Sequence, residues 1–162
     1  MATPQELENK LERLEQRIQV MEDVEAIKKL KALYAKACDD KYNAELMKEV
    51  FTEDALWDSP PFGTFRGRDA ICDFFRSVSG SIVFAIHYFM MPDITVEGNR
   101  AHARWYLWMA ATVSPNRAVW LAALEDDKYE KISDRWWQTE MKGVTLFQTP
   151  YEEGWHKKRM ID

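Results

Sequence analysis

The residue best suited to chemistry in this sequence is His87, the one basic side chain in the apolar run at 82–89. An imidazole gains or loses its proton near neutral pH, so a histidine beside a cavity can act as a general acid or base. The same residue can instead belong to the core, because a buried imidazole is satisfied by one hydrogen bond to a backbone carbonyl. Both interpretations of His87 stay open until its partners are known.

Two further candidates, Tyr34 and Asp39, lie near the end of a predicted N-terminal helix. Five residues separate them, which is roughly 140° around an ideal helix, so they can face one cavity only if the helix ends near Asp39. A carboxylate at a helix end is commonly just solvated, and Asp40 stands directly beside Asp39. The spacing alone therefore assigns no chemistry to Tyr34 or Asp39.

Several kinds of site have no counterpart in the sequence. The His, Cys and carboxylate residues do not have the spacing of metal ligands, and no Gly-rich phosphate loop or G-x-S-x-G turn is present. The two cysteines, Cys38 and Cys72, form no metal or redox motif, so we expect free thiols in a cytoplasmic protein. We therefore expect a protein that works without a metal or a cofactor.

The composition predicts one soluble domain with a large apolar interior. The chain has 162 residues, of which 46% are hydrophobic and 13% aromatic, including seven Trp. An aromatic excess is typical of an apolar pocket or of a contact between subunits. The net charge of −5 argues against nucleic acid as a partner. We also expect no membrane partner, because no stretch reaches the roughly 20 apolar residues of a membrane span.

A helix over 5–36 is the first predicted element, because this stretch lacks Gly and Pro. Thr3, Pro4 and Glu6 are typical of a helix start. Its first half has a narrow apolar stripe with the spacing of a coiled coil, made of Leu7, Leu11, Leu14, Ile18 and Met21. A helix with so narrow a stripe should pair with another subunit, so we predict a homo-oligomer. The alternative is a frayed N-terminal extension.

From residue 24 onwards the pattern is that of a folded domain, since the apolar face of the helix widens there. The sequence predicts further helices at 43–51 and 68–78, strands at 82–89, 101–109, 117–132 and 136–148, and turns at Pro92 and 97–99. In the second of these strands the residues alternate between two faces. One face carries Ala101, Ala103, Trp105, Leu107 and Met109, and the other carries His102, Arg104, Tyr106 and Trp108.

Helices followed by an antiparallel meander predict an α+β fold, in which a strongly curved sheet wraps the helices around a cone-shaped cavity. Gly143, inside the last strand, is expected to mark a bend or bulge that helps the sheet to curve. The predicted organisation is a helical extension at 1–23, a domain at 24–155 and a tail at 156–162.

The order of these elements resembles the NTF2-like superfamily, and the details are similar to its SnoaL-like branch. The resemblance covers roughly 24–155 and rests on five stretches in the family's order: AIKKLKALYAKACDDKY, LMKEVFTEDALWDSP, FRGRDAICDFF, RWYLW and DDKYEKISDRWW. This fold carries enzymes, binding modules and transport adaptors, so the resemblance implies the fold more directly than a reaction. Relatives of this kind form dimers or trimers, and we favour a trimer for this chain.

Within that branch the chain resembles cofactor-independent dehydratases and lyases, such as the bile acid 7-alpha-dehydratases. The resemblance implies that Asp39 and His87 form a catalytic pair and that Tyr34 lines the pocket. In such a pair the imidazole is the base and the carboxylate holds its tautomer. The phenol of Tyr34 could bind a substrate oxygen or protonate the leaving group.

Two positions depart from the dehydratase pattern and make the pocket less polar. A pocket-facing Asp of those enzymes falls on Met109, and an Arg of the last strand falls on Thr145. Both changes favour a flat aromatic or otherwise apolar substrate over a bile acid. The residues that we expect to line such a pocket are Trp57, Phe89, Trp105, Met109, Trp120 and Thr145.

The predicted function is a cofactor-free lyase or dehydratase that uses His/Asp acid–base chemistry on a hydrophobic cyclic or aromatic molecule, such as a steroid, a polyketide or a lignin-derived phenylpropanoid. The alternatives are a non-catalytic binding or accessory module and an isomerase or cyclase of the same fold. The sequence leaves open whether the reaction is dehydration, deformylation, isomerisation or cyclisation. A general base needs its orienting carboxylate within about 3 Å, so the distance between Asp39 and His87 separates an enzyme from a binding module.

Overall fold

The computed structural model of the chain describes residues 2–60 and 62–160. Within these residues the elements follow in the order α1 (Pro4–Asp39), α2 (Ala44–Met47), β1 (Phe51–Ser59), β2 (Gly63–Arg66), α3 (Arg68–Val78), β3 (Ile82–Glu97), β4 (Arg100–Val113), β5 (Arg117–Ile132), β6 (Arg135–Pro150) and α4 (Gly154–Lys157). Helices precede a run of long strands, so the predicted α+β class is confirmed.

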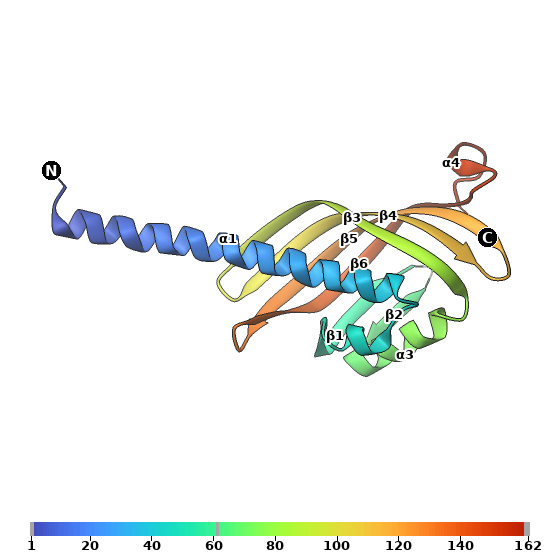
Figure 1. Ribbon diagram of the computed structural model, residues 1–162, viewed down its shortest axis with the longest axis horizontal. Coiled ribbons are helices and arrows are strands. Elements are labelled where there is room, and N and C mark those ends of the chain that lie inside the picture. Colours follow the sequence, from blue (N-terminus) through green and yellow to red (C-terminus); the bar gives the residue numbers. More distant parts are fainter. Residues whose placement is uncertain (1, 61, 161–162) are drawn as a thin grey trace.

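The described strands form a six-stranded sheet in the order β2-β1-β6-β5-β4-β3. Neighbouring strands are antiparallel except β1 and β6, which run parallel. The predicted meander is therefore β3 to β6, and the two strands before α3 extend it. Figure 1 shows the sheet curling around the second half of α1, while α3 lies beside β1 and β2. This arrangement is the NTF2-like cone that the sequence predicted.

The alternation along β4 determines which side chains reach the interior. Its odd-numbered residues from Ala101 to Ala111 are all buried, whereas His102, Arg104 and Tyr106 are exposed on the other face. Successive side chains of a strand point to opposite faces, so the inner face of the sheet carries the apolar set. The predicted assignment of the two faces of β4 is confirmed.

β3 is longer than predicted and passes through Pro92 without a turn, so the predicted turn there is wrong. The pairing with β4 shifts between Met90 and Asp93, and Met91 has a positive φ of 51°, which marks a bulge. The proline is tolerated because β3 is an edge strand, where its missing N–H deprives no neighbour of a hydrogen bond. The other predicted turn, at 97–99, is confirmed, since β3 ends at Glu97, β4 begins at Arg100 and Gly98 between them has a φ of 61°.

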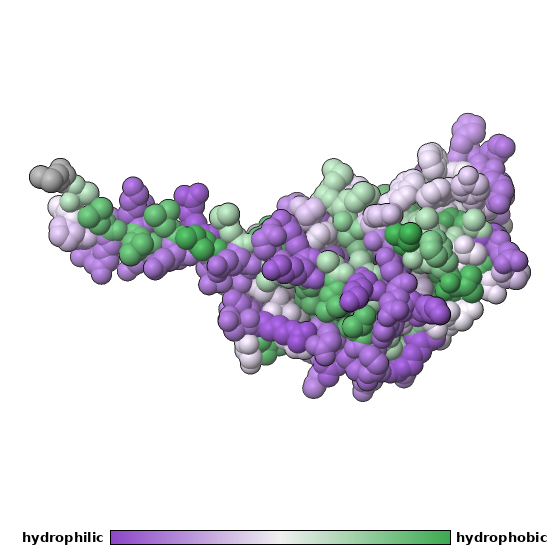
Figure 2. Space-filling model, viewed as in Figure 1, coloured by the Kyte–Doolittle hydropathy of each residue, from purple (hydrophilic) through white to green (hydrophobic). Residues whose placement is uncertain are grey.

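α1 begins as predicted and extends far beyond the sheet (Figure 1). Thr3 caps it, because its side chain accepts a hydrogen bond from the backbone N–H of Glu6 while the Glu6 side chain accepts one from the Thr3 N–H. Every residue from 2 to 22 is exposed, and burial starts at Asp23. Figure 2 shows apolar side chains along this free part of the helix. Among the described residues, no helix is both long enough and apolar enough to cross a membrane.

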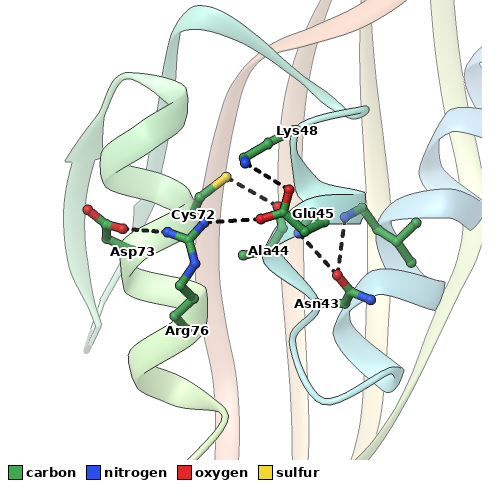
Figure 3. Close-up of polar contacts among 8 residues, drawn as sticks. Asn43, Ala44, Glu45, Lys48, Cys72, Asp73 and Arg76 are labelled. Atoms are coloured by element: carbon green, nitrogen blue, oxygen red, sulfur yellow. Dashed lines mark hydrogen bonds and ion pairs between the residues drawn. The ribbon is translucent and has the colours of Figure 1, made fainter.

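α2 is shorter than the predicted helix at 43–51. Asn43 caps it and accepts hydrogen bonds from the backbone N–H groups of Glu45 and Leu46. Phe51 instead starts β1 and pairs with Gln138 of β6, so long-range strand pairing ends the helical stretch. Figure 3 shows how α2 is joined to α3, whose bounds are as predicted: Arg76 bridges to Glu45, and the Cys72 thiol donates to the Ala44 carbonyl.

The end of the chain is more regular than the predicted tail. β6 continues through Pro150, and the short helix α4 follows. A backbone bridge between Gln148 and Met160 then brings the chain back beside β6. Residues 161–162 of the predicted tail lie outside the described residues.

Candidate active site

The His87 ring and the Asp39 carboxylate meet where the end of α1 lies against β3. Asp39 is the last residue of α1, and its Oδ1 accepts a hydrogen bond from the backbone N–H of His87 at 2.9 Å. The same oxygen lies 2.8 Å from His87 Nδ1. A carboxylate accepts hydrogen bonds, so this contact favours the tautomer with the proton on Nδ1. The lone pair of Nε2 then remains free to accept a proton.

His87 lines a cavity between the helices and the inner face of the sheet, and its side chain is only 7% exposed. Aromatic side chains from β1, α3 and the loop before β2 form much of the wall, including Trp57, Phe62, Phe74 and Phe75. The space open to the centre of a water molecule is about 60 Å³, enough for only a few waters. A ligand with several rings therefore requires rim side chains such as Phe62 to move.

Tyr34 lines the same cavity from α1. Its hydroxyl oxygen accepts a hydrogen bond from the Trp57 indole Nε1 at 3.1 Å. Burial, together with the neighbouring Cys38 and Glu125, raises the pKa of Tyr34 well above its ordinary value. The phenol therefore keeps its proton at neutral pH, and with its acceptor side occupied it can still donate that proton to a ligand.

Of the six residues predicted to line the pocket, Trp57, Met109 and Thr145 do so. Met109 lies directly opposite His87 in the register of β3 and β4, which places it beside the imidazole. The Thr145 hydroxyl donates a hydrogen bond to the Pro60 carbonyl at 3.1 Å. Their contact with a substrate stays a prediction.

The prediction that Trp120 lines the pocket is wrong. Its neighbours Val119 and Leu121 are buried on the inner face of β5, so Trp120 points to the outer face by the two-residue period of a strand. There its ring packs against Trp108 and Tyr151, at centroid distances of 5.7 and 6.0 Å.

Trp105 and Phe89 are also absent from the lining, although both lie on the helix side of the sheet. The Trp105 indole donates to the Tyr129 hydroxyl at 3.2 Å, and the Phe89 ring packs against Tyr34 with a centroid distance of 5.7 Å. Both rings lie under the ammonium group of Lys31, at 5.8 and 4.2 Å from their centroids. They pack beside the cavity instead of forming its wall.

A buried ionic cluster, which the sequence did not predict, lies next to the cavity. Lys31, which is 1% exposed, donates from Nζ to Glu125 Oε2 at 2.6 Å and to Asp127 Oδ2 at 2.7 Å. The Tyr129 hydroxyl also donates to Asp127 Oδ2, at 2.7 Å. Glu125 lines the cavity, whereas Asp127 lies behind it. The cluster is thus a second polar group at the candidate site.

The charges of this cluster stabilise one another. Burial acts to lower the pKa of Lys31, but Asp127 and Glu125 outweigh burial and hold it above the usual value, so the ammonium stays charged. Burial raises the pKa of Asp127 to about 6 even though Lys31 opposes the shift. Below that pH Asp127 becomes neutral, and the balance of charge behind the cavity changes.

The period of β5 could have revealed the cluster. Leu121, Ala123, Glu125, Asp127 and Tyr129 alternate along one face, and the first two are apolar. Since that face is the inner one, the two carboxylates had to be buried and to need a cation. The position of Lys31 among buried residues of α1 was the matching signal.

The described residues contain no group of three or more His, Cys, Asp or Glu side chains placed to hold a metal ion. Both cysteines are buried and free. Besides the groups already described, two buried ionisable side chains line the cavity, Cys38 and Tyr42.

Several solved structures are similar to this one. A proposed aromatic ring hydroxylase from Novosphingobium aromaticivorans is 26% identical, and the match covers 80% of this chain and 94% of that one with a TM-score of 0.76. The hexachlorocyclohexane dehydrochlorinase LinA-type3 from Novosphingobium barchaimii is 21% identical over 87% and 93% of the chains, with a TM-score of 0.71. A proposed scytalone dehydratase from Novosphingobium aromaticivorans is 20% identical over 81% and 89%, with a TM-score of 0.74.

The family of the chain follows from a match to a family model that covers most of the domain and not only single motifs. The model of a family described as a SnoaL-like domain matches residues 19–142, which is more than half of the chain. That range includes the end of α1, all of β3 and the pairing strands β4 and β5, so it contains the elements that bring Asp39 and His87 together. The chain belongs to the SnoaL-like domain family and has the NTF2-like fold.

Proposed function

We propose that this protein is a cofactor-free lyase that removes water or another small group from an apolar cyclic or aromatic molecule. The observation that carries the proposal is the 2.8 Å contact between Asp39 Oδ1 and His87 Nδ1, in a histidine that lines an apolar cavity. A carboxylate so placed orients the imidazole and stabilises the imidazolium that forms when it accepts a proton. A binding module needs no such pair.

In the proposed reaction, His87 Nε2 accepts a proton from a carbon that is made acidic by a neighbouring group such as a carbonyl. The electrons of the broken C–H bond form a carbon–carbon double bond, and the bond to the leaving group on the next carbon breaks. Tyr34, which is protonated and lines the same cavity, gives its proton to a departing oxygen. The imidazolium then returns a proton to the phenolate, so the products are an alkene and water.

An apolar substrate is supported by the cavity wall. Met109 and Thr145 stand where the resemblance to the dehydratases implied charged side chains, and the remaining wall is rich in aromatic rings. The similar structures are described as a dehydrochlorinase, a scytalone dehydratase and an aromatic ring hydroxylase, names that concern small cyclic molecules. A flat ring fits a narrow aromatic cavity better than a bulky polar ligand.

We further propose that the protein is a homo-oligomer, a trimer in preference to a dimer, and that it works in the cytoplasm. The apolar stripe of α1 supports the first proposal, because its residues are 42% to 67% exposed: Leu7, Leu11, Leu14, Ile18 and Met21. The edge strand β3 adds exposed Phe84 and Tyr88. The two free thiols support a reducing compartment.

The test is a panel of cyclic and aromatic substrates that carry a leaving group next to an acidic C–H bond, with products followed by chromatography. His87→Ala should lower turnover by about 10²–10⁴-fold, the usual contribution of a positioned acid–base group. Its free energy of unfolding should change by about 1 kcal/mol, because the ring lines a cavity. Asp39→Asn should also lose turnover, by as much or less, because the amide cannot hold the ring in the same way.

His102→Ala is the matched control, since His102 is an exposed histidine on the outer face of β4 and should leave turnover unchanged. If His87→Ala unfolds but keeps its activity per folded molecule, His87 is a structural histidine and the proposal fails. If panel compounds bind to the wild type and none is converted, the protein is a binding module.

A further inference from the structure

The cavity has a second polar end, far from His87. Met109 pairs with His87 on one side and with Leu121 on the other, so these three lie in one row across the sheet. Glu125 lies four residues further along β5, which is about 13 Å along the strand. On α1, Lys31 precedes Asp39 by eight residues, or about 12 Å of helix. The base and the Glu125 carboxylate therefore approach the cavity from opposite ends, with Tyr34 between them.

The Glu125 carboxylate has an oxygen left for a ligand. Its Oε2 accepts the hydrogen bond from Lys31, while no described residue donates a hydrogen bond to Oε1. The side chain is 7% exposed and lines the cavity. Asp127 Oδ1 is also without a donor among the described residues, but Asp127 does not line the cavity, so Glu125 is the carboxylate of the cluster that a ligand can reach.

The negative charge of the cluster favours a ligand that donates a hydrogen bond to Glu125. Two carboxylates, Glu125 and Asp127, share the single ammonium of Lys31, and Tyr129 adds a neutral hydroxyl to the Asp127 side only. One negative charge is thus uncompensated within the cluster. A buried anionic oxygen is stabilised when an O–H or N–H group donates a hydrogen bond to it. An apolar group in the same place leaves the oxygen without a hydrogen bond, which costs free energy.

We propose that Glu125 is the specificity-determining anchor of the cavity and accepts a hydrogen bond from a hydroxyl group on the substrate, at the end away from the carbon that His87 deprotonates. Lys31 acts as a positioning residue that holds Oε2, so that Oε1 faces the ligand. The preferred substrates are then phenols or ring alcohols, and their O-methylated counterparts are poor ligands. This inference rests on the proposed function in that it takes the cavity as the substrate site.

The experiment measures equilibrium binding of 4-ethylphenol and 4-ethylanisole, which differ only by the methyl group on oxygen, using tryptophan fluorescence and calorimetry. The wild type should bind the phenol roughly 10-fold to 100-fold more tightly, the range that corresponds to a hydrogen bond to a charged group. Glu125→Gln presents an amide in place of the carboxylate and should abolish this preference, while its affinity for 4-ethylanisole stays within about threefold of wild type.

Asp127→Asn is the matched control, because Asp127 pairs with the same lysine but does not line the cavity, and the variant should keep the phenol preference. Equal wild-type affinities for the two probes, no saturable binding of the phenol, or a preference that survives in Glu125→Gln would each overturn the assignment. The wild-type comparison decides the point even if a variant does not fold. Binding is read without turnover, so a failure of the lyase proposal would appear in the substrate panel and not in this measurement.

Discussion

Lys31 illustrates how far a single side chain of this protein depends on its partners. An ammonium group that is 1% exposed is tolerated because two carboxylates and three aromatic faces surround it. Replacing such a buried ion pair by apolar residues is often neutral or stabilising, so stability alone does not explain why a fold contains one. Lys31 reaches the cavity only through Glu125, and the proposed positioning of that carboxylate would give the buried ammonium group a function.

Asp127 predicts how stability depends on pH. Burial raises its pKa in the folded protein from an ordinary 3.8 to about 6. A raised pKa means that the folded state binds the proton more tightly, so the contribution of Asp127 to stability is full below pH 4 and is lost as the pH rises through 6. Relative to Asp127→Asn, the wild type should therefore lose on the order of 1–3 kcal/mol between pH 4 and pH 7.

Urea unfolding of both proteins at pH 4, 5, 6 and 7 checks this sign. Asp126→Asn, an exposed neighbour on the same strand, is the control and should show no such trend. A wild type that gains stability over Asp127→Asn as the pH rises would mean that Lys31 outweighs burial at this site.

At the scale of elements, β1 and β6 approach each other so closely that a Cβ at Gly143 of β6 would collide with the Ser59 side chain of β1. A Cβ placed on Gly143 would lie 2.6 Å from Ser59 Oγ and 3.1 Å from Ser59 Cβ. Both residues line the cavity, so this close approach also shapes the wall beneath the candidate site. The predicted bulge does not occur at Gly143, because the shifts of register between β5 and β6 fall elsewhere, whereas its role in bending the strand stays a prediction.

We predict that Gly143→Ala lowers the free energy of unfolding by about 1–3 kcal/mol, the usual effect of overpacking. Ser59→Gly removes both atoms that the new methyl would meet, so the double variant should recover much of the loss. Gly80→Ala is the control, because its methyl group would meet its nearest neighbour at 3.9 Å. Thermal or urea unfolding of the four proteins checks the coupling, and additive effects of the two substitutions would contradict it.

At the scale of the whole molecule, residues 2–22 form the part of α1 that is exposed throughout. Figure 1 shows α1 projecting from the domain, and Figure 2 shows its apolar side chains in the open. The helix joins the domain at Asp23, which accepts a hydrogen bond from Trp136 at 2.8 Å and pairs with Lys131 at 3.0 Å. Removal of residues 1–23 would therefore also remove a buried contact of the domain.

A chain that starts at Val20 keeps Asp23 and loses most of the stripe. If the stripe assembles the protein, light scattering should give a smaller mass for this chain than the oligomer of the full one, in which each copy contributes 19.1 kDa. The full-length variant Leu11→Lys/Ile18→Lys should dissociate in the same way, whereas Glu8→Lys/Glu15→Lys, which leaves the stripe intact, should not. An unchanged oligomer in the shortened chain would show that other surfaces, such as the edge of β3, hold the subunits together.

The sequence by itself determined what depends on local periodicity and on end signals. The capping residues of α1, the bounds of α3 and the two faces of β4 follow from patterns that act within a few residues. The α+β class followed from the order of these patterns. The pairing of Asp39 with His87 was predicted from a resemblance to known enzymes. Asp39 and Tyr34 can face one cavity only if the helix ends near Asp39, and α1 does end there.

Only the tertiary structure decided what depends on contacts between distant residues. Phe51 became a strand residue because β6 lies beside it, and Trp120 faces outwards because the register of β5 puts Val119 and Leu121 inside. Lys31 meets Glu125 and Asp127 across 94 and 96 residues of chain. No local pattern specifies such a contact, because the free energy that orders it comes from burying both partners together, and this happens only when the sheet curves around the helix.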